Sequence, residues 1–135
     1  ILTEDGPKII ELTCRMGGTR LPEVCGTYWG VDFYALSIHL ALGEKINLPP
    51  IPTGKSNAAH NLIVSRQGTF LSMDQINSEF SHQIYFNSGE RLALNSAQQI
   101  EIGYIQLIRE DPSFILEDLT NEANRLTSSV RLLEE

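Results

Sequence analysis

Cysteine is scarce in this 135-residue chain, which contains only Cys14 and Cys25. Two cysteines so placed are too few for a disulfide scaffold and lack a zinc-ligand spacing, so we expect reduced thiols in a cytoplasmic protein. Basic residues are also few, because ten Lys and Arg stand against seventeen Asp and Glu and the formal net charge is -7. Such an acidic surface repels nucleic-acid phosphates and anionic lipids. We therefore expect neither nucleic acid nor a membrane as a partner, and no apolar run is long enough to cross a bilayer.

The three histidines do not indicate a zinc site or a Cys-His nucleophile. His39 falls in an apolar segment, His60 at the start of an expected strand and His82 in an expected loop, with no short spacing between any two of them. The sequence therefore favours structural roles for all three histidines.

The most informative segment is the run over residues 9–18, in which polar and apolar residues alternate before a double glycine. Alternation is the period of a β-strand, so Glu11, Thr13 and Arg15 share one face. The opposite face is apolar and consists of Ile10, Leu12 and Cys14. The polar face thus presents a carboxylate, a hydroxyl and a guanidinium in a row.

This row of side chains suits a magnesium-bound polyphosphate. Magnesium takes oxygen ligands from one or two carboxylates together with phosphate, and Arg pairs with phosphate oxygens. Gly17 and Gly18 end the run and would let the main chain come close to a bound ligand. The residues alone also allow a simpler interpretation, in which Glu11 and Arg15 form an exposed ion pair on a strand surface.

The same residues resemble the C-terminal end of the ATP-grasp fold of carbamoyl-phosphate synthetase, biotin carboxylase and the L-amino-acid ligases. The resemblance covers residues 4–18 and continues in Gly30–Phe33 and Leu40–Glu44. A looser match follows at Gly103-Tyr-Ile105, in the small module that closes ligases of this type. The resemblance therefore extends in the right order over most of the chain.

In that family a carboxylate and an Asn two residues later bind magnesium, and an Arg two residues further on contacts the phosphates or the acyl phosphate. The resemblance implies that Glu11 is a metal ligand and that Arg15 is the catalytic phosphate contact. Gly17 and Gly18 would then belong to the nucleotide site. Thr13 stands where the family has Asn, and its hydroxyl would be a weaker second metal ligand than an amide oxygen.

The resemblance implies an ATP-dependent ligase that uses magnesium and joins a small-molecule carboxylate to an amine through an acyl phosphate. The family's adenine pocket, glycine-rich loop and other metal-binding acid precede the motif, whereas this chain begins at Ile1. We therefore expect a C-terminal fragment of a larger ligase that is inactive alone. The alternative is a noncatalytic binding or dimerisation module, in which the strand charges only solubilise an edge and a homodimer can form.

We expect an α+β chain in three parts. Residues 1–47 would be the end of an ATP-grasp domain, with an antiparallel hairpin over residues 1–14 and packed helices. Residues 48–57 are rich in Pro and Gly and would form a linker. Residues 58–135 would be a small β-rich module closed by a helix. Its expected strands are residues 58–65, 68–73, 83–86, 91–94 and 100–108, with the third and fourth forming a hairpin.

Local signals define three helices. A short helix begins at Leu21. A second helix, over residues 31–42, begins near the capping residue Asp32. Apolar residues lie nearly all round it, so it should be covered by a core or a partner. Asp111 is expected to cap the last helix. The apolar stripe of that helix would be Leu116, Leu119, Ala123, Leu126, Val130 and Leu133. Arg20 follows the double glycine and would either contact an anion or lie solvated on the surface.

Overall fold

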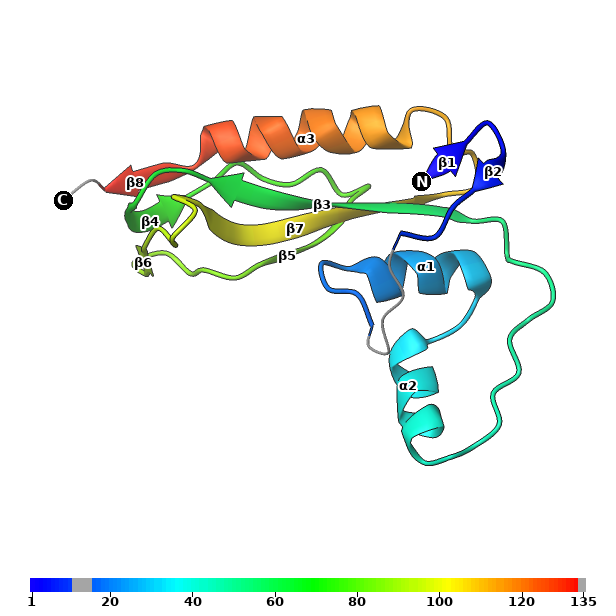
Figure 1. The fold of residues 1–135 in the computed structure, drawn as a ribbon. Coiled ribbons are helices and arrows are strands. Elements are labelled where there is room, and N and C mark those ends of the chain that lie inside the picture. The colour runs from blue at the N-terminus through cyan, green and yellow to red at the C-terminus, as the bar shows by residue number, and fades with distance from the viewer. Residues whose placement is uncertain (11–15, 134–135) are drawn as a thin grey trace.

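The computed structural model describes residues 1–10 and 16–133, which form a mixed α+β fold (Figure 1). The predicted α+β class is therefore confirmed. The described elements are β1 (Leu2–Thr3), β2 (Gly6–Pro7), α1 (Leu21–Trp29), α2 (Phe33–Ala41), β3 (Ser56–Val64), β4 (Gly68–Ser72), β5 (Ser81–Ile84), β6 (Arg91–Leu92), β7 (Ile100–Arg109), α3 (Ile115–Ser129) and β8 (Arg131–Leu133).

The central sheet has the strand order β3-β7-β5 and is antiparallel throughout. Its register shifts in the middle, because Leu62 pairs with Gly103 whereas Ile63 pairs with Glu101. Ile102 is thus the extra residue of a β-bulge. The bulge changes which residues face the core, from Ile100 and Ile102 before it to Ile105 and Leu107 after it.

The hydrophobic core lies between this sheet and α3, which runs along one face of β3 and β7 (Figure 1). The core side chains of α3 recur every three or four residues, as expected for one face of a helix. They are Ile115, Leu119, Ala123 and Leu126, and the buried Val130 follows directly after the helix. All the residues of the hydrophobic core lie between Leu62 and Val130.

Two residues of the predicted stripe are not part of the core. Leu116 is 69% exposed because it follows the buried Ile115 and points about a quarter-turn away from that line. Leu133 is 60% exposed because the helix has ended and the residue belongs to β8. The predicted cap is also wrong, because Phe114 is the N-cap residue and Asp111 instead accepts a hydrogen bond from the Ser113 backbone.

A second sheet has the order β6-β4-β8. Residues 68–73 were expected as a strand, and β4 confirms this to within one residue. The predicted hairpin is wrong, because β5 pairs with β7 while β6 pairs with β4. The intervening turn is closed by the Asn87 backbone, which donates to the Glu90 side chain at 2.8 Å. The two flanking strands consequently enter different sheets.

The N-terminal half contains the short β1–β2 hairpin and two helices. α1 extends beyond its predicted end, and α2 is capped by Asp32, whose carboxylate accepts from the backbones of Tyr34 at 2.8 Å and Ala35 at 3.1 Å. That predicted cap is therefore confirmed. α1 packs against β3 on the face opposite α3 (Figure 1).

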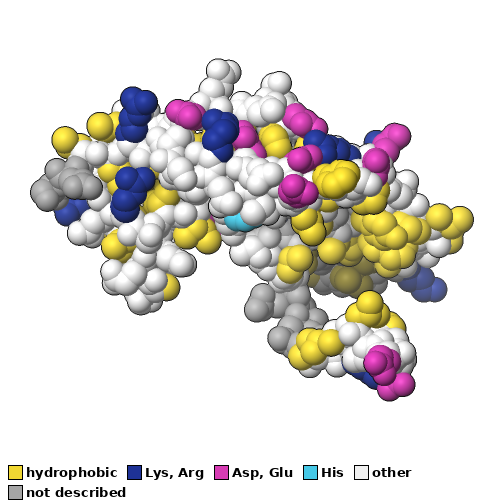
Figure 2. All heavy atoms as spheres, turned by 90° about the horizontal axis from the view of Figure 1, so that it is seen from above, with side chains coloured by type: hydrophobic (Ala, Val, Ile, Leu, Met, Phe, Trp, Pro, Cys, Tyr) yellow, Lys and Arg dark blue, Asp and Glu magenta, His cyan; other side chains and the backbone are white. Residues whose placement is uncertain are grey.

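No residue of α2 is buried, so the described chain supplies no core around it. Exposed apolar side chains of α2 and the segment after it include Ile38, Leu40, Leu42, Leu48 and Ile51. Figure 2 shows apolar side chains gathered toward the end of the molecule that carries the N-terminal half. The segment from Leu42 to Lys55 contains no helix or strand and leads into β3. The predicted domain boundaries stay a prediction.

Candidate functional site

The predicted phosphate and metal contacts fall partly within the described residues. Glu11, Thr13 and Arg15 lie outside them, whereas Gly17 and Gly18 lie inside. A side chain at Gly17 would collide with Leu21, because an added Cβ would lie 2.8 Å from the Leu21 Cδ1 atom. An added Cβ at Gly18 would meet no atom within 4 Å, so the main chain there borders open space.

The chain turns sharply between the double glycine and α1. Thr19 and Arg20 both adopt left-handed backbone conformations, with φ of 52° and 66°. Such conformations are uncommon for residues other than Gly, because the Cβ atom crowds the backbone. The Leu21 backbone N–H closes the turn by donating to the Gly18 carbonyl at 3.2 Å. The side chain of Arg20 is thereby placed at the start of α1, next to the central sheet.

Arg20 is held by side chains from three elements. Its Nη1 atom donates to Glu23 of α1 at 2.8 Å, and its Nη2 atom donates to Gln83 of β5 at 3.3 Å. Its guanidinium carbon lies 3.7 Å from the centre of the Tyr104 ring of β7, in cation–π geometry. The Arg20 side chain is only 25% exposed. The prediction of a solvated surface Arg is therefore wrong.

Alternation along β7 explains why Tyr104 is available to Arg20. Ile105 and Leu107 face α3 and are buried, so Tyr104 and Gln106 face the α1 side. Gln106 donates to the side chain of Asn57 at 2.9 Å. Asn57 in turn donates to the Thr27 hydroxyl at 2.8 Å, which fastens α1 to the same face.

Glu23 is the electrostatic partner of Arg20 in this cluster. Burial disfavours its charge, but hydrogen bonds from its own backbone, from Arg20 and from the Tyr34 hydroxyl outweigh that effect and hold its pKa below the ordinary value. The same contact raises the pKa of Tyr34, whose hydroxyl donates to Glu23 at 3.0 Å. Although burial opposes it, hydrogen bonding to Glu23 and Tyr85 also raises the pKa of Arg20. All three groups therefore keep their usual protonation states at neutral pH.

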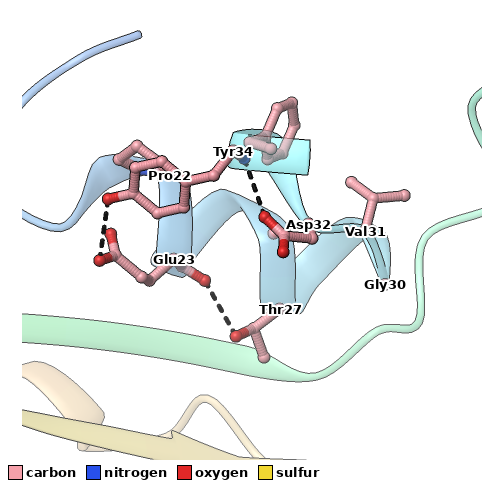
Figure 3. A pocket seen from close by; sticks show the side chains of 9 residues that line it. Pro22, Glu23, Thr27, Gly30, Val31, Asp32 and Tyr34 are labelled. Atoms are coloured by element: carbon pink, nitrogen blue, oxygen red, sulfur yellow. Dashed lines mark hydrogen bonds between the residues drawn. The ribbon is translucent and has the colours of Figure 1, made fainter. Parts of the chain in front are cut away.

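A cavity of about 470 Å³ lies between α1 and α2 (Figure 3). Its polar lining includes Glu23, Thr27, Asp32 and Tyr34, and its apolar lining includes Pro22, Val31 and Phe33. Glu23 accepts from Tyr34 and Arg20 through Oε1, whereas its buried Oε2 has no hydrogen-bond partner among the described residues, and Asp32 caps α2. Two negative side chains make this cavity unsuitable for phosphate.

A second cavity of about 290 Å³ adjoins the double glycine. It is lined by Met16, Gly17, Leu21, Pro22, Cys25 and Phe33, and it has almost no polar wall. This cavity therefore suits apolar packing rather than phosphate or metal.

All three histidines are exposed, and His82 lies in β5 rather than in the expected loop. His39 contacts Glu44 at 2.5 Å, and ring nitrogens of His60 and His82 lie near backbone carbonyls. Within residues 1–10 and 16–133, no group of three or more His, Cys, Asp or Glu side chains could hold a metal ion. Over the same residues, every helix is too short or too polar to traverse a bilayer.

Sequence reasoning missed Glu23, Tyr34, Gln83 and Tyr104 as a group. Tyr104 lies within the Gly103-Tyr-Ile105 match, and that was its single local signal. The other members belong to different elements and meet only in the folded chain.

No family model matches this sequence, and no solved structure matches it. A protein of Sinorhizobium fredii described as "Uncharacterized protein y4rH" is 29% identical over 109 residues. The matched region covers 76% of this chain and 23% of that protein, so the chain spans about a quarter of the relative's length.

Proposed function

We propose that this chain is the C-terminal part of an ATP-grasp ligase that joins a small-molecule carboxylate to an amine. Residues 1–47 would form the end of the ATP-grasp domain, and residues 58–135 would form the small C-terminal module. Glu11 would bind magnesium, with Thr13 as a weaker second ligand. Both offer oxygen atoms, which are the donors that magnesium prefers.

The proposed reaction has two steps. The γ-phosphoryl group of ATP passes to the substrate carboxylate, which gives an acyl phosphate and ADP. The amine then attacks the acyl carbon, the amide bond forms and inorganic phosphate leaves. Arg15 would neutralise charge on the transferred phosphoryl group, and the main chain at Gly17 and Gly18 would contact the phosphates.

The observation that carries this proposal is the spacing of Glu11, Thr13, Arg15 and the double glycine. The described geometry after it is compatible with a ligand, because the main chain at Gly18 borders open space. These features support a phosphate-binding role.

A noncatalytic binding or dimerisation module is the second candidate, and the bare surface of α2 favours it. Ile38, Leu40 and Leu42 are each more than 60% exposed, and large exposed apolar patches mark interaction sites. The ligase proposal accounts for the same surface if another part of the enzyme covers it. The two candidates differ in whether Glu11 and Arg15 are needed for chemistry.

The test uses the full-length protein that carries this chain and follows ADP release with magnesium, ATP and panels of carboxylates and amines. Glu11→Gln should abolish turnover, because a metal ligand stabilises charge most in the transition state. Arg15→Lys should lower kcat by about 100-fold, because an ammonium cannot reproduce bidentate contacts to phosphate. Glu4→Gln, in the exposed turn of the hairpin, is the matched control and should keep full activity. Normal ADP release by a folded Glu11→Gln variant would refute the assignment.

The isolated 135-residue chain gives a second test. Titration calorimetry with magnesium and a nonhydrolysable ATP analogue should show binding weaker than micromolar, since the phosphate contacts alone remove little apolar ligand surface from water. Binding at micromolar affinity, about -8 kcal/mol, would mean that a complete nucleotide site lies within these residues.

A further inference from the structure

We propose that Tyr104 is a positioning residue for the double-glycine turn and acts on it through Arg20. The C-terminal sheet would then set the geometry of the phosphate-binding segment rather than merely follow it in sequence. This inference rests on the proposed function of Gly17 and Gly18 as phosphate contacts. The contact itself can be tested without ATP.

The turn needs an external support because its backbone is strained. Thr19 and Arg20 are consecutive left-handed residues, and neither is Gly. Residues other than Gly hold such conformations when surrounding contacts determine them. Within the turn itself, the described backbone bond is the long one from Leu21 to Gly18, at 3.2 Å. The side chain of Arg20 supplies further support, through its contacts with Glu23, Gln83 and Tyr104.

The support on the sheet side comes from two paired strands. Tyr104 of β7 and Gln83 of β5 are direct register partners, and both reach Arg20. The Tyr104 ring is itself braced by Tyr85, with ring centres 6.5 Å apart. The hydrophobic core packs on the opposite face of these strands and fixes them, so the Arg20 guanidinium contacts a rigid surface.

On the sheet side, Arg20 contacts the ring face of Tyr104 and the side chain of Gln83. The guanidinium carbon lies 3.7 Å from the ring centre, whereas the bond to Gln83 is 3.3 Å long. A cation over a ring face is attracted by the ring quadrupole, and Phe offers such a face as well as Tyr does. An aliphatic side chain at position 104 fills space but has no such face. Tyr104→Phe should therefore preserve the function of this residue, and Tyr104→Leu should not.

The experiment compares the 135-residue chain with its Tyr104→Leu and Tyr104→Phe variants by NMR. The Arg20 side-chain resonances should carry a ring-current shift in the parent chain and in Tyr104→Phe, and should lose it in Tyr104→Leu. Amide hydrogen exchange at Leu21 should become about tenfold faster in Tyr104→Leu, because the turn opens more often. In Tyr104→Phe it should stay within about twofold of the parent value.

Arg20→Ala is the second variant and leaves the sheet untouched. It should accelerate exchange at Leu21 as much as Tyr104→Leu does, while amides of β3 and β7 stay protected. Unchanged exchange at Leu21 in both variants would overturn the positioning role. Equal acceleration in Tyr104→Phe would also overturn it, because the hydroxyl and not the ring would then be responsible.

The two proposals can fail separately. The exchange measurements concern the contact and need no nucleotide, so they decide the positioning role. In the full-length protein, Tyr104→Leu should lower kcat for ADP release with little change in KM for ATP, and Tyr104→Phe should not. If Glu11→Gln leaves turnover intact, the proposed function fails whatever the exchange data show.

Discussion

Replacing Gly103 by Ala should destabilise the sheet module strongly, because β5 approaches β7 most closely at this residue. An added Cβ would lie 2.3 Å from the carbonyl oxygen of Gln83 and 3.1 Å from the Cα atom of Ile84. Both are backbone atoms, so no side-chain rotation can relieve the contact. The pair of strands must separate locally.

The cost follows from the size of that overlap. Inserting a methyl group into a well-packed site costs about 1–3 kcal/mol. At about 2 kcal/mol, the melting temperature of a domain of this size should fall by roughly 10 °C. Because Gln83 also contacts Arg20, the turn before α1 should loosen in the same variant.

Thermal unfolding followed by circular dichroism measures the effect, and Gly89→Ala is the matched control. Gly89 also has a positive φ, of 95°, but an added Cβ there meets no atom within 4 Å. Its cost should be the backbone strain alone, about 1 kcal/mol. If Gly103→Ala melts at the same temperature as the parent chain or as Gly89→Ala, the close approach of β5 is not what requires Gly at position 103.

Two further predictions concern α3. Leu126→Ala should lower the free energy of unfolding, measured by chemical denaturation, by about 2–5 kcal/mol because Leu126 is fully buried. Leu116→Ala, at an exposed position of the same helix, should change it by no more than about 0.5 kcal/mol. Glu122 accepts hydrogen bonds from the Arg125 side chain and from the Asn77 backbone. The bond to Arg125 is the main reason that the pKa of Glu122 is lowered from 4.5, although burial opposes the shift. A lowered folded-state pKa stabilises the fold above pH 4.5 and loses that effect as the pH falls through the lowered value. Glu122→Gln should therefore melt at a lower temperature than the parent chain at pH 7. The difference in melting temperature should shrink as the pH falls from 4.5 through the lowered pKa. A difference that persists below that pKa would contradict this explanation.

The sequence predicts the elements whose signals are local. The β-branched and apolar runs gave β3, β4 and β7 to within two residues of their observed bounds, and Asp32 marked the start of α2. These predictions succeed because strand and cap preferences depend on a few neighbouring residues.

The pairing of strands could not be predicted in the same way. The strands expected at residues 83–86 and 91–94 have the appearance of a hairpin, yet β5 and β6 join different sheets. The choice depends on which edge is free beside β7 and β4, and those edges exist only after the sheets have formed. The bulge at Ile102, which reverses the buried face of β7, likewise has no signal except the adjacent Gly103.

The same distinction between local signals and contacts formed only on folding applies to the candidate site. The double glycine and its run are proposed as a site from their spacing, whereas the cluster around Arg20 has no such signal in the sequence. Arg20 and Tyr104 are far apart in the sequence, and a cation–π contact leaves no periodic pattern. Gln83 has no local signal at all, because its role depends on its register with Tyr104.

The pairing of β3 with β7 also determines how this chain must fold. Ser56 pairs with Arg109 and Val64 with Ile100, so the central sheet joins segments separated by all of β4, β5 and β6. Closing so long a loop costs chain entropy before the contacts that compensate for it exist. α3 can form its first turns early from local contacts, but its apolar stripe has no surface to pack on until that pairing is complete. We therefore expect the joining of β3 to β7, and not helix formation, to limit the folding rate.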